Sequence, residues 1–338
     1  KLKMEITVEQ YNQSLESTWD KFIEDNNRNA TFLHSRKFFN HNPQNQKDDT
    51  SLLFYKNGKL KAVLPACLME INGLLTFISH PRSTYGGFIV DESIGVEEAI
   101  AIVEETINFA KSKNAEEIII RNPFRIFYQL PSDETDYAMW FHGFSIKSRE
   151  LECAIKLCAD PESRYEDGTK RSVKKALKSA VSVRETDDYE LFWQHLSANL
   201  SEKHGAKPTH TIEQFYQLKN QVSEDKIKLI GAFIDEKLVG GIVLFISKPT
   251  VLHAQYIASD LNYQNSRPLN AVIDYILKWG WEQGFSYLNL GSANEEAGRK
   301  INFGLFRFKE GFGGRGVLRE TMHMKLNSPK INSSTETQ

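Results

Sequence analysis

The sequence predicts an α+β protein made of two similar domains, each with a mixed sheet and packed helices. The chain has 338 residues, which is too long for one ordinary core. Its hydrophobic content of 40% and charged content of 25% are close to globular averages, so most of it should fold. The decisive observation is that one order of elements occurs twice: a hairpin, a strand, a helix and a strand.

The first copy of this order lies in the N-terminal half. Residues 51–71 contain two apolar strands around a turn at Asn57-Gly58, a pattern typical of a hairpin. Residues 96–117 place apolar side chains at helical spacing, and the β-branched run 118–123 indicates a buried strand. A hairpin combined with a helix-linked parallel pair predicts a mixed sheet.

The second copy lies in the C-terminal half. Residues 228–248 repeat the hairpin with a turn at Asp235-Glu236, residues 268–286 repeat the helix, and residues 287–294 repeat the strand. Two unrelated α+β domains are the alternative to a duplication. We expect domains at 1–160 and 161–326, the second opening on a basic helix, and a disordered tail at 327–338.

Bulk composition excludes several classes of function. The net charge of −2 argues against a general nucleic-acid-binding protein, so we expect no DNA partner. Cys67, Cys153 and Cys158 form no C-x-x-C pair, which favours a reduced cytoplasmic chain with cysteines as core fillers. No apolar run approaches the roughly 20 residues of a transmembrane helix.

The stretch GFGGRG at 311–316 matches G-x-G-x-x-G, the dinucleotide fingerprint. That motif binds pyrophosphate only where it opens a helix. Residues 317–326 alternate with period two, as a strand does. The dinucleotide interpretation therefore fails. The chain also lacks H-E-x-x-H, zinc-type Cys/His spacing, G-x-x-x-x-G-K-[ST] and G-x-S-x-G, so we expect no metal and no permanently bound cofactor.

Several stretches resemble the GNAT acyltransferases, and in particular their FemAB-like branch of tandem-domain acyl and aminoacyl transferases. They are an opening helix with a TFLHS turn at 19–39, a basic helix at 170–185, KHGAKPTHTIEQF at 203–215, and a strand, polar turn and aromatic-Lys-Gly-Phe-Gly run at 288–314. The resemblance implies two tandem GNAT-like domains with a cleft between or beside them. It covers roughly residues 15–326.

The resemblance implies a bacterial N-acyltransferase that moves an acyl group to an amine, such as an amino sugar or a cell-envelope precursor in polysaccharide biosynthesis. The acceptor would be a small molecule or a nucleotide- or lipid-linked one. Acyl-CoA is the expected co-substrate. The alternatives are an aminoacyl-tRNA-dependent transferase of peptidoglycan bridges, with tRNA as partner, and a non-catalytic double GNAT that binds a glycan or peptide.

The donor site is expected in the second domain. Acyl-CoA-using GNAT enzymes usually place a Gly-rich turn before the central helix, but residues 263–271 (YQNSRPLNA) contain no glycine. Asn265, Ser266 and Arg267 stand in that position, and Tyr256 lies on the strand expected to splay from its neighbour. In the first domain, acidic residues at 91–99 disfavour an anion, so we expect that domain to be the degenerate one.

Three residues are candidates for catalysis. Lys309 lies in FRFKEGFGG, where an ammonium among aromatic rings has a strong field on an oxyanion, and the family has a functional lysine here. A lysine with only its apolar stem covered is the alternative. Glu295 follows the strand 287–291 and is a candidate general base, or else a capping acid. His204 suits proton transfer near neutrality.

Further residues are candidates for substrate binding. A stripe of Lys170, Lys174 and Lys178 with Arg171 and Lys175 suits a polyphosphate or an RNA backbone, or is a solvated face. Arg36 suits a phosphate or carboxylate, and Arg36 and Tyr85 would line the cleft between the halves. The complete set of expected substrate contacts is Arg36, Tyr85, Arg171, Lys175, Lys207, Asn294, Asn302, Phe308 and Phe312.

Overall fold

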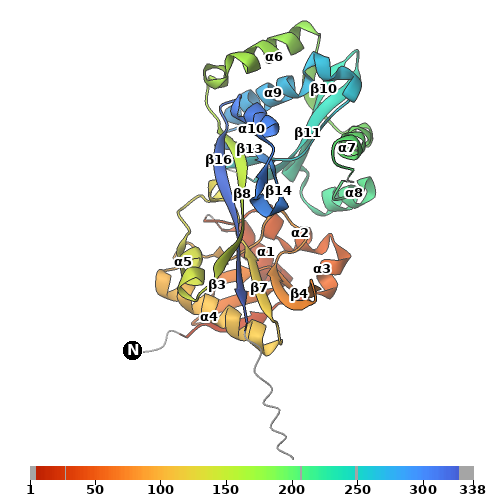
Figure 1. Ribbon diagram of the computed structural model, residues 1–338. Helices are drawn as coiled ribbons and strands as arrows, with labels where there is room; N and C mark the ends of the chain where they lie inside the picture. The colour runs from red at the N-terminus through yellow and green to blue at the C-terminus, as the bar shows by residue number, and fades with distance from the viewer. Residues whose placement is uncertain (1–4, 27, 206–207, 248–249, 327–338) are drawn as a thin grey trace, which may run out of the picture. The chain divides into compact units, whose positions relative to one another are not determined.

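A computed structural model of the chain describes residues 5–26, 28–205, 208–247 and 250–326 (Figure 1). The chain divides into two compact units, each a mixed α/β assembly. Among the described residues, unit 1 comprises those of 5–123, 130–148 and 320–326, and unit 2 comprises those of 124–129 and 149–319. The predicted fold class, two mixed-sheet domains in tandem, is confirmed.

Unit 1 contains two sheets, with strand orders β1-β2-β3-β6 and β4-β5-β7-β16. Its strands are β1 (Thr7–Gln10), β2 (Leu52–Lys56), β3 (Lys59–Leu64), β4 (Ala66–Ile71), β5 (Leu74–Ser79), β6 (Ile89–Val90), β7 (Glu117–Arg121) and the end of β16 (Arg315–Lys325). Its helices are α1 (Glu16–Glu24), α2 (Arg36–Asn40), α3 (Pro43–Lys47), α4 (Val96–Ser112) and α5 (Glu134–Phe141). The buried face of α4 packs with both sheets in one hydrophobic core.

Unit 2 has the strand order β8-β13-β12-β11-β10-β9. Its strands are β8 (Ser145–Lys156), β9 (Ser182–Thr186), β10 (Ile227–Ile234), β11 (Lys237–Ser247), β12 (Val251–Ser259), β13 (Tyr287–Ser292) and the short pair β14 (Asn294–Glu295) and β15 (Lys300–Ile301). Its helices are α6 (Asp167–Lys178), α7 (Tyr189–His204), α8 (Ile212–Gln221), α9 (Pro268–Glu282) and α10 (Phe303–Glu310). Helix α9 lies on the sheet beside α6 (Figure 1).

The predicted repeat of elements is present in both units. In unit 1, β5 and β7 are parallel and α4 connects them; in unit 2, β12 and β13 are parallel and α9 connects them. Each parallel pairing spans only three residue pairs. The hairpin turns also agree, because Asn57 and Asp235 both adopt the left-handed conformation that such short turns require. The order of elements was predictable because each element has its own local pattern.

The units do not follow the predicted boundary at residues 160 and 161. Strands β8 and β16 are each long enough to contribute residues to both units. Residues 320–326 therefore belong to unit 1, where Thr321–Lys325 pair with β7. A short segment, residues 124–129, belongs to unit 2 although it follows β7 in the chain.

The glycine-rich stretch connects α10 to β16 and opens no helix. Gly313 has a φ of 84°, which lets the chain reverse direction after α10. Gly314 is needed for close packing, because a Cβ there would lie 2.4 Å from Cys153 Sγ and 2.7 Å from the Lys309 carbonyl oxygen. These glycines therefore place α10 against β8.

In the part of the chain that the structure describes, no helix is both long and apolar enough to cross a bilayer.

We predict that Gly314→Ala lowers the free energy of unfolding by about 1–3 kcal/mol, because the new methyl group overlaps backbone that cannot move freely. Urea unfolding of both proteins measures the difference. Gly304→Ala on α10 is the matched control, since the nearest atom to its Cβ is at an ordinary 3.5 Å. Equal stability of Gly314→Ala and the wild type would contradict the packing argument.

Candidate functional site

The parallel strands β12 and β13 separate in the middle of the unit 2 sheet. Their pairing runs from Val251 opposite Tyr287 to His253 opposite Asn289 and stops there, while β12 continues to Ser259. A bulge between β11 and β12 at Val243/Leu244 adds to the local distortion. The carboxyl ends of parallel strands are where ligands bind in α/β sheets. The expected splay of the Tyr256 strand is therefore present.

Lys309 lies at this point and is only 3% exposed. Its Nζ donates to the carbonyl oxygens of Gly291 and Ser292, at 2.8 Å each. Gly291 has a φ of 74°, so β13 bends where it presents these carbonyls. In the described part of the chain, two of the three N–H donors of Lys309 are thus engaged and the third has no hydrogen-bond partner.

A buried polar cluster lies next to the bend. Asn289 Nδ2 donates to Glu152 Oε2 at 3.0 Å and to His253 Nδ1 at 3.1 Å, and Asn289 Oδ1 accepts from the Gly291 N–H at 3.0 Å. Glu152 lies opposite Ser292 in the strand register. The cluster therefore fixes both the end of β12–β13 pairing and the bend that holds Lys309.

The electrostatics of this cluster follow from burial. Burial lowers the pKa of Lys309 from 10.5 to about 8, against the smaller opposite effects of Cys153 and Glu152. Burial raises the pKa of Glu152, while Arg319, 3.5 Å away, and Asn289 act against that rise. Burial lowers the pKa of His253 to about 4, so its imidazole is neutral at pH 7. The pKa of Lys309 is thus brought close to physiological pH.

Tyr256 lies on the part of β12 that has left β13. Its hydroxyl hydrogen-bonds His210 Nδ1, and its ring packs edge-on against Trp193 with centroids 5.1 Å apart. Trp193 Nε1 in turn donates to the His210 carbonyl oxygen at 3.1 Å. Burial raises the pKa of Tyr256, so the hydroxyl keeps its proton. Its expected role toward the donor remains a prediction.

The start of α9 lacks a free cradle of amide groups. Arg267 adopts the left-handed conformation, and its carbonyl oxygen accepts from the Asn270 and Ala271 amides at 3.1 and 3.4 Å. Pro268 has no amide hydrogen. Asn265 and Arg267 are exposed and Ser266 is half-buried in the 3₁₀ turn before the helix. The start of α9 therefore offers the positive charge of Arg267 to a donor, but it offers few free backbone amides.

Three residues expected near Lys309 have structural partners. Asn302 caps α10 by accepting from the Leu305 amide at 2.9 Å, and Asn294 Oδ1 accepts from the Leu151 amide at 2.6 Å. Glu295 lies on the small β14–β15 hairpin, where its side chain is 44% exposed and pairs with Lys300 at 2.8 Å. Asn302 therefore has a structural role as the N-cap of α10. Glu295 remains a candidate base, but it sits in a wetter setting than Glu152.

Two aromatic residues expected to touch substrate belong to the core. Phe312 is buried and packs edge-on against Tyr165 and Phe308, at centroid distances of 5.2 and 5.5 Å. Phe308 is half-buried in the same cluster. For Phe312, burial corrects the expectation of substrate contact. Both rings instead anchor α10, the helix that carries Lys309.

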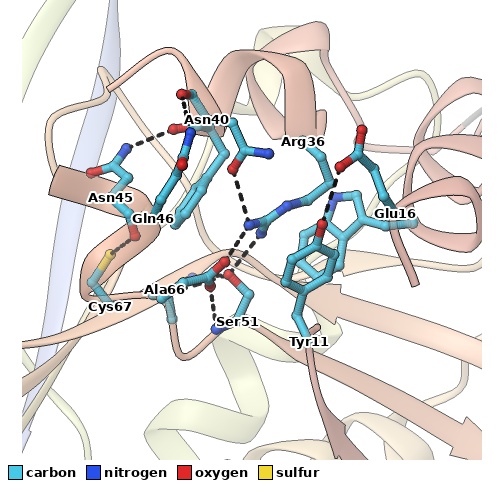
Figure 2. Close-up of polar contacts among 12 residues, drawn as sticks. Tyr11, Glu16, Arg36, Asn40, Asn45, Gln46, Ser51, Ala66 and Cys67 are labelled. Carbon is cyan, nitrogen blue, oxygen red and sulfur yellow. Dashed lines mark hydrogen bonds and ion pairs between the residues drawn. The ribbon is translucent and has the colours of Figure 1, made fainter. Parts of the chain in front are cut away.

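Arg36 and Tyr85 were expected to face a cleft and are instead buried in unit 1. Arg36 is 1% exposed, forms an ion pair with Asp49, and donates to Ser51 Oγ at 3.0 Å (Figure 2). Its guanidinium lies 3.6 Å from the ring centroid of Tyr11. Tyr85 donates to Thr31 Oγ1 at 3.2 Å and is also 1% exposed. The sequence shows the charge of Arg36 but not the distant carboxylate that neutralises it.

The remaining expected residues divide into two groups. Arg171 and Lys175 are exposed on α6, as a binding stripe requires. His204 ends α7, and its side chain, like the whole of Lys207, lies outside the described part of the chain. No role for either is proposed from the geometry.

Sequence reasoning missed the buried cluster of Glu152, His253 and Asn289. Each is a polar residue inside an otherwise apolar strand: LECAIK, VLHAQYI and YLNLG. That interruption was a usable signal, because polar groups are buried only when they are hydrogen-bonded. The signal marks burial of polar groups, however, and does not identify which strands lie side by side.

The candidate site lies in a part of the chain that matches a known protein family. Residues 164–309, which include Lys309, match the family model described as an acetyltransferase (GNAT) domain. No curated protein is similar enough in sequence to match. Among solved structures, FemX is similar with a TM-score of 0.68 and 16% identity, over 94% of this chain and 98% of that one.

Two further solved structures share the fold across nearly the whole chain. L-PGS from Bacillus licheniformis has a TM-score of 0.60 and 14% identity, over 95% of this chain and 94% of that one. A tandem GNAT protein from the clavulanic acid biosynthesis pathway has a TM-score of 0.51 and 11% identity, over 96% of this chain and 100% of that one. Residues 164–309 thus match a GNAT acetyltransferase domain, and the chain as a whole shares its fold with FemX and with a tandem GNAT protein.

Proposed function

We propose that this protein transfers an acyl group from an activated ester or thioester to an amine, at the bend of β13 beside Lys309. The observation that carries the proposal is the buried ammonium with a hydrogen-bond donor to spare, at the point where two parallel strands part. The acceptor we propose is an amino sugar or another amine of a cell-envelope precursor, linked to a nucleotide or a lipid.

The proposed chemistry needs no covalent enzyme intermediate. The acceptor nitrogen attacks the donor carbonyl carbon, negative charge develops on the carbonyl oxygen, and the remaining N–H of Lys309 stabilises it. Collapse of this intermediate forms the amide and breaks the carbon–oxygen or carbon–sulfur bond of the donor, whose leaving group takes up a proton and departs as the alcohol or thiol. A fixed donor in a site of low dielectric is far more effective than water, since it needs no reorganisation. The acceptor must lose a proton, and Glu152, whose pKa is raised by burial, is the proton acceptor that we propose, with Glu295 as the alternative.

The geometry of α9 favours an aminoacyl ester, such as an aminoacyl-tRNA, as donor. Pyrophosphate binding at a helix start depends on free backbone amides, but Pro268 has no amide hydrogen and the Asn270 amide already bonds the Arg267 carbonyl. The similarity in fold to FemX and to L-PGS supports the same choice. The sequence favoured acyl-CoA as the donor and aminoacyl-tRNA as the alternative, and our proposal reverses that order.

Acyl-CoA is the second candidate donor. Arg267 is exposed beside the start of α9 and offers a positive charge to a pyrophosphate without needing amides. The family model matched by residues 164–309 is described as an acetyltransferase domain, which is consistent with such a donor.

We predict that Lys309→Met lowers kcat/KM of amide formation by at least about 100-fold, because it removes the charge but keeps an unbranched apolar stem. The measurement is product formation with the donor identified below. Arg307→Ala is the matched control, since Arg307 is exposed on the same helix. Activity of Lys309→Met within a few-fold of the wild type would remove Lys309 from the mechanism.

The pH dependence of the rate tests which form of Lys309 acts. Its pKa is lowered to about 8, so the ammonium is present below that pH and is lost as pH rises through it. We predict that kcat/KM falls above about pH 8, and that Lys309→Arg, whose guanidinium stays charged, removes this fall. A rate that instead rises through pH 8 in the wild type alone would indicate a neutral amine acting as base.

A thermal-shift comparison identifies the donor. A ligand present at about 100 times its dissociation constant adds roughly 2.7 kcal/mol to the free energy of unfolding. We predict a clear increase in melting temperature with aminoacyl-tRNA and none with uncharged tRNA or acetyl-CoA. A shift with acetyl-CoA, lost in Arg267→Ala, would instead establish the second candidate. No shift with any donor would favour a non-catalytic double GNAT that binds a glycan or peptide.

A further inference from the structure

Helix α6 carries five cationic side chains on one side. At about 100° per residue, Lys170, Lys174 and Lys178 form one row, and Arg171 and Lys175 lie next to it. Within the described part of the chain, none of the five forms an ion pair or a side-chain hydrogen bond. Since the whole chain has a net charge of −2, this is a local concentration of free positive charge.

An apolar groove of about 420 Å³ runs beside this row, between α6, β9 and α9. Val173, Val183 and Trp279 are among its apolar lining residues. Leu177 also lines it, is 65% exposed, and lies between Val173 and the lysine row on the helix. The cations and the apolar surface are therefore continuous.

Few carboxylates oppose this charge. Of the acids lining the groove, Asp274 accepts hydrogen bonds from Tyr165 and Lys278, at 2.9 Å each. Glu162 beside α6 pairs with Lys278 at 2.7 Å. Glu282 is the lining carboxylate without an ion pair in the described part of the chain, and the exposed Glu166 and Asp167 stand at the start of α6, so the five cations still outnumber the unpaired acids near them.

We propose that α6 and this groove form a docking surface for an anionic lipid bilayer. The lysine and arginine side chains contact lipid phosphates, while Leu177 and the groove receive apolar parts of the lipid. An RNA backbone would match the cations equally well, but it offers nothing to an exposed leucine and an apolar groove. The proposal concerns location and does not depend on the transfer reaction.

Co-sedimentation of the full chain with vesicles tests the proposal. At about 0.1 M salt we expect binding to vesicles containing phosphatidylglycerol and not to pure phosphatidylcholine. Lys174→Glu with Lys178→Glu should weaken binding at least about tenfold, and Leu177→Ser at least about threefold. The matched control is Lys47→Glu with Lys111→Glu, two exposed lysines of unit 1, which should bind as the wild type does.

Melting temperatures close to that of the wild type establish that each variant is folded. Absence of vesicle binding by the wild type would overturn the proposal. So would wild-type binding that Leu177→Ser and the Lys174/Lys178 variant leave unchanged. Binding of an unrelated RNA that only the charge variant loses, with no binding to vesicles, would assign α6 to a nucleic acid instead.

Discussion

The hydrogen bonds from Lys309 to the Gly291 and Ser292 carbonyl oxygens are the interaction on which the candidate site depends. A buried ammonium without partners would be strongly destabilising, so the fold must supply acceptors within reach. It does so by bending β13 at Gly291, whose amide is held by Asn289. The close approach of Gly314 to the Lys309 backbone holds the helix that carries the ammonium. The bend of β13, helix α10 and the turn at Gly314 therefore depend on one another.

Unit 1 buries a cation in a different way, and the contrast supports our choice of Lys309 as the candidate catalytic residue. Arg36 is paired with the carboxylate of Asp49 and stacked on Tyr11, so its charge is neutralised where it stands (Figure 2). Lys309 is bound to neutral carbonyl oxygens alone, so burial lowers its pKa to about 8. An arginine with a carboxylate partner stabilises a core, whereas a lysine without one is poised to respond to a substrate.

The fold could be predicted from sequence because each of its elements has a local pattern. The turn at Asn57-Gly58, the helical spacing in α4 and α9 and the strand alternation in β16 are all visible within a dozen residues. The site could be predicted only in part. The sequence indicates Lys309 as a candidate because it lies among aromatic residues. It does not predict the bend of β13, whose carbonyl oxygens accept the hydrogen bonds of Lys309.

Long-range partners explain what the sequence could not supply. Glu152 and Asn289 are separated by 137 positions, and nothing local to either one indicates that β8 and β13 are neighbours. The same limit explains the error at Arg36, whose guanidinium has the chemistry to bind a phosphate. Its charge is neutralised by Asp49, and its guanidinium is held by the nearby Ser51 and by Tyr11, so its partners come from two other segments of the chain. Residue type indicates what a side chain can do, and tertiary contacts decide whether it remains available.

The starts of the two central helices suggest how the units came to differ. In α4, Glu98 accepts from the Gly95 amide at 3.0 Å and pairs with Lys56, so this helix supplies its own anion. In α9, the neutral Asn270 stands at the position of Glu98, and Arg267 before the helix is exposed. A carboxylate fixed at a helix start disfavours a second anion there, whereas a neutral side chain does not. We therefore propose that unit 1 has kept the repeat as a scaffold, and that a donor with phosphate groups is received only by unit 2.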